Sequence, residues 1–251
     1  MSGWPQGYGL HVLDEVDSTL NEAARIAPRS PGPVWIMARR QTAARGRRGR
    51  AWAAPEGNLS ATLLMRPEGP AGQVALRSFV AALALFDACA EVTGRREGLS
   101  LKWPNDVLLN GGKLAGILLE SSGIAGQGVM ALSIGIGVNL AEAPPAEAVE
   151  TRALRPVSLA GETGIAIAPE TFLEALARAY DLHERAFVAF GFDPIRTAWL
   201  ARAARLGAVI TARLGTEEIT GTFDTVDGDG NLVLILAGGV TRRVPAADIF
   251  F

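Results

Sequence analysis

The chain has 251 residues, of which 49% are hydrophobic and 20% are charged, and its formal net charge at pH 7 is −2. This composition suits one large domain, or a large and a small one, and it excludes a disordered chain. The slightly negative charge argues against a nucleic-acid-binding protein with one basic face, and the single cysteine, Cys89, excludes a disulfide framework or a cysteine metal site.

No targeting or membrane segment is predicted. The N-terminal stretch MSGWPQGYGLHVLDEVDST lacks the basic region and the long apolar region of a signal peptide. No stretch approaches the roughly 20 apolar residues that a membrane-spanning helix needs. The cytoplasm is therefore the expected location, and no membrane partner is expected.

The first predicted elements are a helix, two strands and a second helix. Glu22 follows Thr19 at a capping-box spacing, which predicts a helix entered at Ser18 and Thr19 and ended by APRSPGP. Residues 34–39 and 59–66 have the apolar, β-branched pattern of strands. The glycine-punctuated basic loop QTAARGRRGRAW follows the first strand, a common place for chemistry. Residues 73–92 predict an apolar helix ended by Gly94.

Four short strands and two helices are predicted next, followed by a small β domain. LSLKWP, DVLLN, KLAGILLES and VMALSIGIGVNL follow one another across short turns, which predicts antiparallel hairpins. AEAPPAEAVETRALRP is typical of a surface connection. Residues 169–190 predict an amphipathic helix, which DPIRTAWLARAARLG continues after a break. From about Ala208 onward, short strands with turn signals predict a small barrel.

The loop RGRRGR, residues 45–50, carries four arginines in six residues. Arginine forks match phosphate and carboxylate oxygens, and Gly46 and Gly49 let the backbone close on a ligand. Four neighbouring positive charges repel, so we expect the loop to be mobile until an anion binds. A solvated basic loop and a nucleic-acid contact are the alternatives. Trp52 suits either stacking on a base or packing against the core.

The stretch KWPNDVLLNGGKLAGILLE, residues 102–120, places two lysines beside hairpin turns. Because a buried lysine without a partner costs several kcal/mol, each lysine should be exposed or face an anion. An exposed strand end is favoured for Lys102, whereas Lys113 is a candidate for binding phosphate or carboxylate. Asp106 suits Mg²⁺ binding or proton transfer from an amine. A plain Asx turn is the alternative for Asn105 and Asp106.

The strand SIGIGVNL, residues 133–140, alternates glycine with branched residues, so a ligand or another part of the chain can approach one face closely. Asn139 at its end suits reading an adenine edge, with a turn-forming asparagine as the alternative. A G-x-G-x-x-G fingerprint, a Walker motif and a metal-ligand cluster are absent from the sequence.

Taken together, these motifs resemble the biotin protein ligases. DST, Q-x-x-x-RGRRGR-x-W, KWPNDVLLNGGKLAGILLE, GIGVNL and VSLAGETG occur in the family's order, from about residue 10 to the end. The resemblance implies an α+β fold in residues 1–205, with a mixed, largely antiparallel sheet flanked by helices, as in class II synthetases. It implies a small SH3-like β-barrel in residues 206–251.

The activity implied by the resemblance is ATP-dependent, AMP-forming biotin ligation. Biotin, with ATP and Mg²⁺, would be activated as biotinyl-5′-AMP and transferred to a lysine of the carrier domain of acetyl-CoA carboxylase or a related carboxylase. Some members also carry an N-terminal repressor domain; with about ten residues before the resemblance begins, neither repression nor nucleic-acid binding is expected. A homodimer remains open. The alternatives are a lipoate or octanoate ligase or transferase and, from another class, a basic-loop nucleic-acid-binding protein.

The motif positions also imply individual roles. The catalytic residues would be Lys113, Arg47 and Asp106, with Asp106 also the candidate Mg²⁺ ligand. Biotin would contact Ser18, Thr19, Gln41, Arg45, Gly46, Arg47, Lys113, Gly116 and Leu118. ATP would contact Arg47, Arg48, Arg50, Trp52, Asn105, Lys113 and Asn139. Two positions depart from the family pattern: Leu20 stands where asparagine is common, with Asn21 one place later, and Ala44 stands where glycine is usual.

Overall fold

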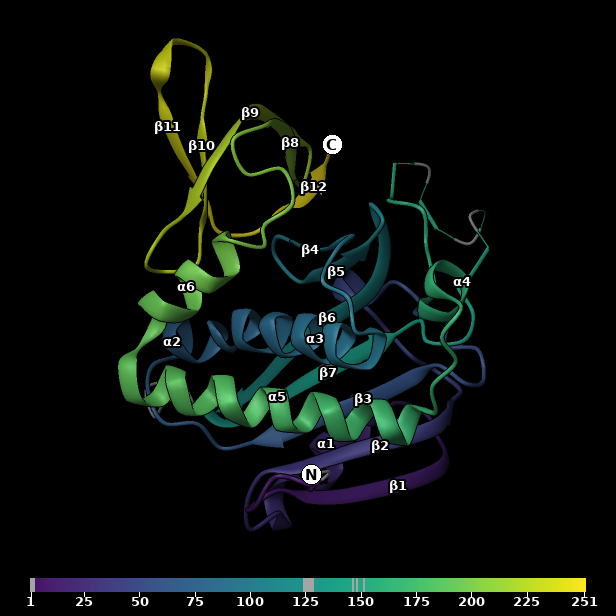
Figure 1. Ribbon diagram of the computed structural model, residues 1–251. Helices are drawn as coiled ribbons and strands as arrows, with labels where there is room; N and C mark the ends of the chain where they lie inside the picture. Colours follow the sequence, from purple (N-terminus) through teal and green to yellow (C-terminus); the bar gives the residue numbers. More distant parts are fainter. Residues whose placement is uncertain (1–2, 124–128, 146, 148, 151) are drawn as a thin grey trace.

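The computed structural model describes residues 3–123, 129–145, 147, 149–150 and 152–251. These residues form a seven-stranded sheet, in the order β1-β2-β3-β7-β6-β5-β4, and a five-stranded sheet, in the order β11-β10-β9-β8-β12. The large sheet lies below the smaller one in Figure 1, with helices packed along it.

The large sheet is mixed and largely antiparallel, as expected. Its strands are β1 (Gly9–Val16), β2 (Val34–Gln41), β3 (Leu59–Met65), β4 (Leu99–Lys102), β5 (Asp106–Leu109), β6 (Gly112–Gly123) and β7 (Val129–Val138). β1 and β2 are parallel, and each other neighbouring pair is antiparallel. A parallel pair needs a crossover, and the helix α1 (Thr19–Ile26) provides it.

Alternating side chains give the sheet a core on each face. On β2, Trp35 and Met37 belong to the main core, whereas Val34 and Ile36 belong to a smaller cluster with Ala23 of α1. The helices α3 (Arg77–Thr93) and α5 (Pro169–Phe190) pack on each other and cover the main-core face. The remaining helices are α2 (Ala71–Ala75), α4 (Leu159–Thr163) and α6 (Phe192–Leu200), and short 3-10 turns span Ala27–Arg29, Arg47–Gly49 and Ala237–Gly239.

The two predicted helix ends turn out differently. Gly94 has φ +66° and ends α3 in the left-handed conformation, as predicted. At the start of α1 the cap is Ser18, whose side chain accepts a hydrogen bond from the backbone N–H of Leu20. The expected cap, Thr19, is the first helical residue instead. Its side chain is therefore free to contact neighbouring strands.

The expectation that no stretch is long and apolar enough to span a membrane is wrong for one segment. Residues Ala71–Thr93 are long enough, and an 18-residue window within them has a mean hydropathy of 1.5. However, 78% of this window is buried inside the protein, where α3 packs against α5 and the large sheet. Its apolar composition is thus explained by its place in the core.

The β domain expected from about Ala208 onward is present, and its strands pair in the antiparallel sense. It consists of β8 (Val209–Leu214), β9 (Glu217–Val226), β10 (Leu232–Ile235), β11 (Thr241–Val244) and β12 (Asp248–Phe250). The turn between β9 and β10 rests on the large domain, because Trp103 Nε1 donates to the carbonyl of Gly230 at 3.0 Å. A Cβ at Gly230 would lie 2.8 Å from Leu76 and 3.0 Å from Phe79, so this turn approaches the start of α3 closely.

Candidate active site

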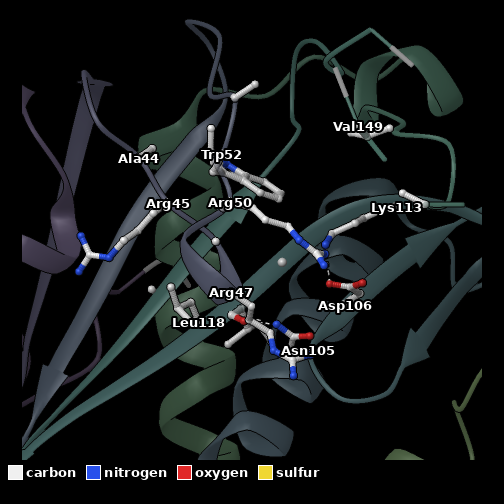
Figure 2. Close-up of a pocket in the computed structure, with 18 of the residues that line it drawn as sticks. Ala44, Arg45, Arg47, Arg50, Trp52, Asn105, Asp106, Lys113, Leu118 and Val149 are labelled. Atoms are coloured by element: carbon white, nitrogen blue, oxygen red, sulfur yellow. Dashed lines mark hydrogen bonds and ion pairs between the residues drawn. The ribbon is translucent and has the colours of Figure 1, made fainter. Parts of the chain in front are cut away.

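A cavity of about 650 Å³ lies where the two domains meet beside the large sheet. Its walls come from the start of α1, the arginine loop (residues 42–52), the strands β5, β6 and β7, residues 149–150 and 152–156, and β12. Figure 2 shows part of this lining. The structure brings together these predicted site residues: Ser18, Thr19, Gln41, Arg45, Gly46, Arg47, Arg50, Trp52, Asn105, Asp106, Lys113, Gly116, Leu118 and Asn139. Arg48 is the predicted site residue that does not line the cavity.

One corner of the cavity is built from buried hydroxyl and amide groups. The Gln41 Oε1 atom accepts hydrogen bonds from the backbone N–H of Thr19 at 2.8 Å and from its Oγ1 at 3.2 Å. Thr62 Oγ1 in turn donates to Thr19 Oγ1 at 2.8 Å. These bonds fix the amide of Gln41 at the end of β2 with its carbonyl oxygen engaged. Its NH₂ group has no partner among the described residues, so the corner offers donors to a polar ligand.

The four arginines of the loop have different partners. Arg45 forms an ion pair with Glu120 at 2.8 Å and donates to Asn21 Oδ1 at 2.6 Å, and Figure 2 shows it pointing away from Lys113 and Asp106. Asn21, shifted by one position from the family pattern, thus orients Arg45. Glu120 of the same chain thus provides a negative charge to the loop. The prediction that the empty loop is mobile did not consider such internal partners.

Arg48 and Arg50 are held by the C-terminal domain. Both pair with Asp248, at 2.6 and 2.9 Å, and Arg50 also lies 3.1 Å from Glu150. Arg48 adopts the left-handed conformation, with φ +57°, which is uncommon for a residue other than glycine. The ion pair with Asp248 and this backbone turn together direct Arg48 away from the cavity.

Arg47 is the loop arginine without a carboxylate within 4 Å in the described part of the chain. Its Nη1 donates to the carbonyl of Ala247 at 3.4 Å, and its side chain lines the cavity. Burial lowers the pKa of Arg47, against the opposing effect of Asp248 and Asp106. A guanidinium remains charged at any physiological pH. Arg47 is therefore the loop cation with the most free hydrogen-bonding capacity toward an anionic ligand.

Asp106 lies between two lysines. Its Oδ1 is 2.7 Å from Lys113 Nζ, and its Oδ2 is 3.8 Å from Lys102 Nζ. The strand register explains this cluster, because Asp106 pairs with Lys102 across β4 and β5. Asp106 and Lys113 also face the same cavity from adjacent strands. The carboxylate thus orients both ammonium groups before any ligand binds.

Lys102 is a site residue that the sequence interpretation missed. Its side chain is 12% exposed and lines the cavity, so the expected exposed strand end is wrong. Burial lowers the pKa of Lys102, whereas Asp106 raises it. Lys102 and Lys113 are the only lysines in the 251-residue sequence, and both face this cavity. The signal available in the sequence was that both lysines of the chain occur within residues 102–113, whereas every other basic residue is arginine or histidine.

The two predicted asparagines are anchored differently. Asn105 makes two hydrogen bonds to Ile117 of β6. Its side-chain Nδ2 donates to the Ile117 carbonyl, and its backbone carbonyl accepts from the Ile117 N–H. This holds the turn before β5 more firmly than a plain Asx turn. The Nδ2 of Asn139 donates to the carbonyl of Val157 at 3.0 Å. Its buried Oδ1 has no partner among the described residues, so it is available as an acceptor.

The glycine-lined strand face contacts a side chain of the same chain. Gly116 and Gly137 are register partners on β6 and β7, and a Cβ at Gly137 would lie 2.5 Å from the indole of Trp52. The Trp52 ring therefore covers this face, and Lys113 Nζ is 5.6 Å from the ring centre. Gly135 similarly leaves room for the Leu20 side chain, because a Cβ added at Gly135 would lie only 2.9 Å from it.

Substituting Gly137 with alanine should displace Trp52. The added methyl group has no room beneath the indole, and overpacking of this kind costs about 1–3 kcal/mol. We expect a lower free energy of unfolding by this amount and stronger quenching of tryptophan fluorescence by acrylamide. Gly72→Ala is the matched control, because its added Cβ meets nothing within 4 Å. Equal quenching in both variants would contradict the position of the indole.

The segment expected to be a surface connection forms a cavity wall. Pro144, Val149, Glu150, Arg152, Ala153, Leu154 and Pro156 line the cavity. Two backbone hydrogen bonds fix the wall to β6. The N–H of Lys113 donates to the carbonyl of Arg155, and the N–H of Val157 donates to the carbonyl of Lys113. Residues 146, 148 and 151 of this segment lie outside the described residues. Its Pro, Ala and Glu composition carries no sign of this role.

The described residues form no cluster of three acidic, histidine or cysteine side chains suited to a metal ion. The carboxylates that line the cavity are Asp106, Glu150 and Asp248, and each is paired with a lysine or an arginine. The cations already present oppose a metal ion bound by protein groups alone. A divalent ion would therefore need anionic ligands from a bound nucleotide.

The departures from the family pattern are accommodated locally. Leu20 is buried against Gly135, while Asn21 binds Arg45. Ala44 accepts a backbone hydrogen bond from Trp52 at 3.0 Å and is not among the described residues with positive φ. A glycine is thus not required at this position for the observed loop conformation.

Comparisons with known proteins agree with the sequence motifs. The Biotin/lipoate A/B protein ligase family matches residues 13–139, and the Biotin protein ligase C terminal domain matches residues 206–251. A biotin--[acetyl-CoA-carboxylase] ligase of Paracoccus denitrificans is 55% identical over 96% of this chain and 99% of its own. The bifunctional ligase/repressor BirA of Bacillus subtilis is 30% identical over 96% of this chain and 74% of its own.

A solved structure supports the same assignment. The biotin protein ligase from Aquifex aeolicus in complex with biotin and ATP superposes with a TM-score of 0.79 at 26% identity, covering 96% of this chain and 97% of that one. The motifs, the fold and these matches agree along the chain, which belongs to the biotin protein ligases.

Proposed function

We propose that this protein activates biotin with ATP and transfers it to a lysine of a carboxylase carrier domain. In the first step a biotin carboxylate oxygen attacks the α-phosphorus, the bond to the β-phosphate breaks, and biotinyl-5′-AMP and pyrophosphate form. In the second, the carrier amine attacks the acyl carbon, loses a proton, and AMP leaves. The observation that carries the proposal is the meeting of Arg47, Lys113 and Asp106 in one cavity with the polar corner at Gln41.

The polar corner is our candidate for the ureido ring of biotin. Ser18, Thr19 and Gln41 present hydroxyl and amide groups there, and Gly116 and Leu118 line the cavity from β6. We propose that Arg45 and Gly46 form the wall at this end of the site. Because Glu120 already neutralises Arg45, we assign that arginine to shaping the biotin pocket and Arg47 to the charge of the reaction.

The opposite end suits ATP. The biotin carboxylate and the phosphates repel before they react, and Arg47 and Lys113 would offset this repulsion as charge develops at the α-phosphorus. Arg48 and Arg50 would contribute positive charge near the phosphates and hold the loop in place. Asn105 would fix the turn before β5. The free Oδ1 of Asn139 suits the adenine amino group. Trp52, beside Lys113, would shield the adenylate from water.

We propose that Mg²⁺ enters with ATP and is held mainly by its phosphates, with Asp106 as the protein ligand once Lys113 has turned to the nucleotide. The ion would neutralise phosphate charge and favour departure of pyrophosphate. Removing divalent ions with a chelator should reduce biotin-dependent pyrophosphate release by at least about 100-fold. Retention of the rate without divalent ions would contradict a metal requirement, and restoration by added Mg²⁺ is the control.

The partner and setting follow from this activity. The name of the Paracoccus relative supports an acetyl-CoA carboxylase carrier as the partner. Domains at 1–205 and 206–251 are our proposed division, supported by the two family matches. We propose the cytoplasm, where ATP is available, with no membrane partner. A homodimer is consistent with the exposed edge strand β1.

The alternatives are not favoured. A lipoate or octanoate ligase would share the family model, but it would not share the 55% identity to a biotin ligase. Nucleic-acid binding through the arginine loop is opposed by carboxylates that already occupy three of its four arginines. We do not expect nucleic acid as a partner.

The deciding experiment offers the purified protein ATP and Mg²⁺ with biotin or with lipoate, and measures pyrophosphate release. We expect release with biotin only, followed by labelling of a carrier domain. Replacing the acceptor lysine of the carrier with arginine is the control for transfer. Faster pyrophosphate release with lipoate than with biotin would overturn the proposal.

A further inference from the structure

Asp248, at the start of β12, binds three arginines. Its carboxylate lies 2.6 Å from Arg48, 2.9 Å from Arg50 and 3.2 Å from Arg213. Burial alone would raise the pKa of Asp248, but the hydrogen bonds from Arg50 and Arg213 and the nearby charges lower it. Its side chain is only 14% exposed. Asp248 is therefore an ionised group held firmly between the arginine loop and β8.

The C-terminal domain, which carries Asp248, is attached to the large domain by contacts that do not involve the arginine loop. Trp103 donates to the carbonyl of Gly230, and Arg196 of α6 donates to the carbonyl of Val226 at 2.9 Å. Both contacts lie at the β9–β10 end of the domain and involve the large domain. β12 lies on the side of the C-terminal sheet that faces the large domain (Figure 1). The loop is thus bound to a separately anchored element.

The pairing with Asp248 divides the loop arginines into two groups. Arg48 and Arg50 are bound by the carboxylate. Arg47, which lines the cavity, has no carboxylate partner among the described residues and makes only a 3.4 Å contact to the carbonyl of Ala247. Ala247 directly precedes Asp248. The same short stretch of chain therefore holds two arginines and places the third beside the cavity.

We propose that Asp248 is a positioning residue, which holds the arginine loop closed so that Arg47 faces the phosphates of ATP. The proposal rests on the proposed ligase function for its kinetic test. Without the carboxylate, Arg48, Arg50 and Arg213 would repel one another at short range. The loop would then be closed for a smaller fraction of the time, and the apparent affinity for ATP would fall by that fraction.

The kinetic test compares Asp248→Ala with the wild-type protein in biotin-dependent pyrophosphate release. We expect the KM for ATP to rise about tenfold while kcat stays within about threefold, because the closed loop is rarer but unchanged when ATP binds. Asp248→Glu should recover part of the affinity. The matched control is Asp224→Ala, an exposed carboxylate on β9 of the same domain. An unchanged or lower KM for ATP would overturn the proposal.

A second measurement needs no activity. Trypsin cleaves after arginine, so its rate of cutting within residues 45–50 reports how often the loop opens. We expect several-fold faster cutting in Asp248→Ala than in the wild type or in Asp224→Ala, without ligands. Equal cutting rates would contradict a positioning role. If the wild type releases no pyrophosphate with biotin, the ligase proposal fails, while this comparison still tests the role of Asp248.

A double-mutant cycle distinguishes positioning from a general structural effect. Arg48 acts through Asp248 in this proposal, so Arg48→Ala should add little to the KM change of Asp248→Ala. Asp248→Asn keeps the shape of the side chain and serves where the alanine variant folds poorly. Strictly additive effects of Arg48→Ala and Asp248→Asn would overturn the proposal.

Discussion

Replacing Lys113 with alanine should lower the kcat/KM of biotin-dependent pyrophosphate release by about 10²–10³-fold. Removing one preorganised group that stabilises developing charge typically costs this much, about 2.7–4 kcal/mol of transition-state stabilisation. Lys113 projects into the cavity from the start of β6, and Asp106 orients its ammonium group at 2.7 Å.

The fold should survive this substitution. The Lys113 side chain is 33% exposed, and a partly exposed ion pair contributes about 0–1 kcal/mol to stability. Thermal unfolding should therefore shift little, and Lys113→Arg, which keeps the charge, should recover part of the rate. Unchanged pyrophosphate release in the folded alanine variant would refute the role of Lys113.

Replacing Asp106 with asparagine should slow transfer of biotin from biotinyl-5′-AMP to the carrier by at least about 100-fold. The incoming lysine amine has a reference pKa near ~10.4, so it must lose a proton, and a positioned general base typically contributes about 10²–10⁴-fold. In the empty site Asp106 binds Lys113. Once Lys113 turns to the phosphate, the carboxylate becomes available to the amine.

This prediction is tested in a single turnover with preformed biotinyl-5′-AMP, which bypasses activation. Hydroxylamine, an amine that is already unprotonated at neutral pH, serves as the control nucleophile. We expect Asp106→Asn to slow the carrier reaction far more than the reaction with hydroxylamine. Equal slowing of both would exclude a role in deprotonation and would leave Asp106 as the residue that orients Lys113 and Lys102.

Much of the chemistry was readable from short stretches of sequence. The hairpins of β4 to β7, the glycine end of α3 and the family motifs all depend on residues close together in the chain, so local patterns determine them. The family, and with it the ligase activity, followed from those motifs and agrees with the comparisons. Tertiary structure corrected the cap of α1 by one residue, because Thr19 is recruited by Gln41 and Thr62 instead.

The sequence by itself therefore determined the fold class, the family and the motif residues that meet at the cavity, but not Lys102 or the wall formed by the segment after β7. Only the tertiary structure decided how the charges pair. Arg45 is neutralised by a carboxylate 75 positions away, and Arg48 and Arg50 by one 200 and 198 positions away, which leaves Arg47 without a carboxylate partner among the described residues. The physical reason is range: an ion pair depends on separations of a few ångströms, and six adjacent residues carry no information about which distant carboxylate reaches each of them.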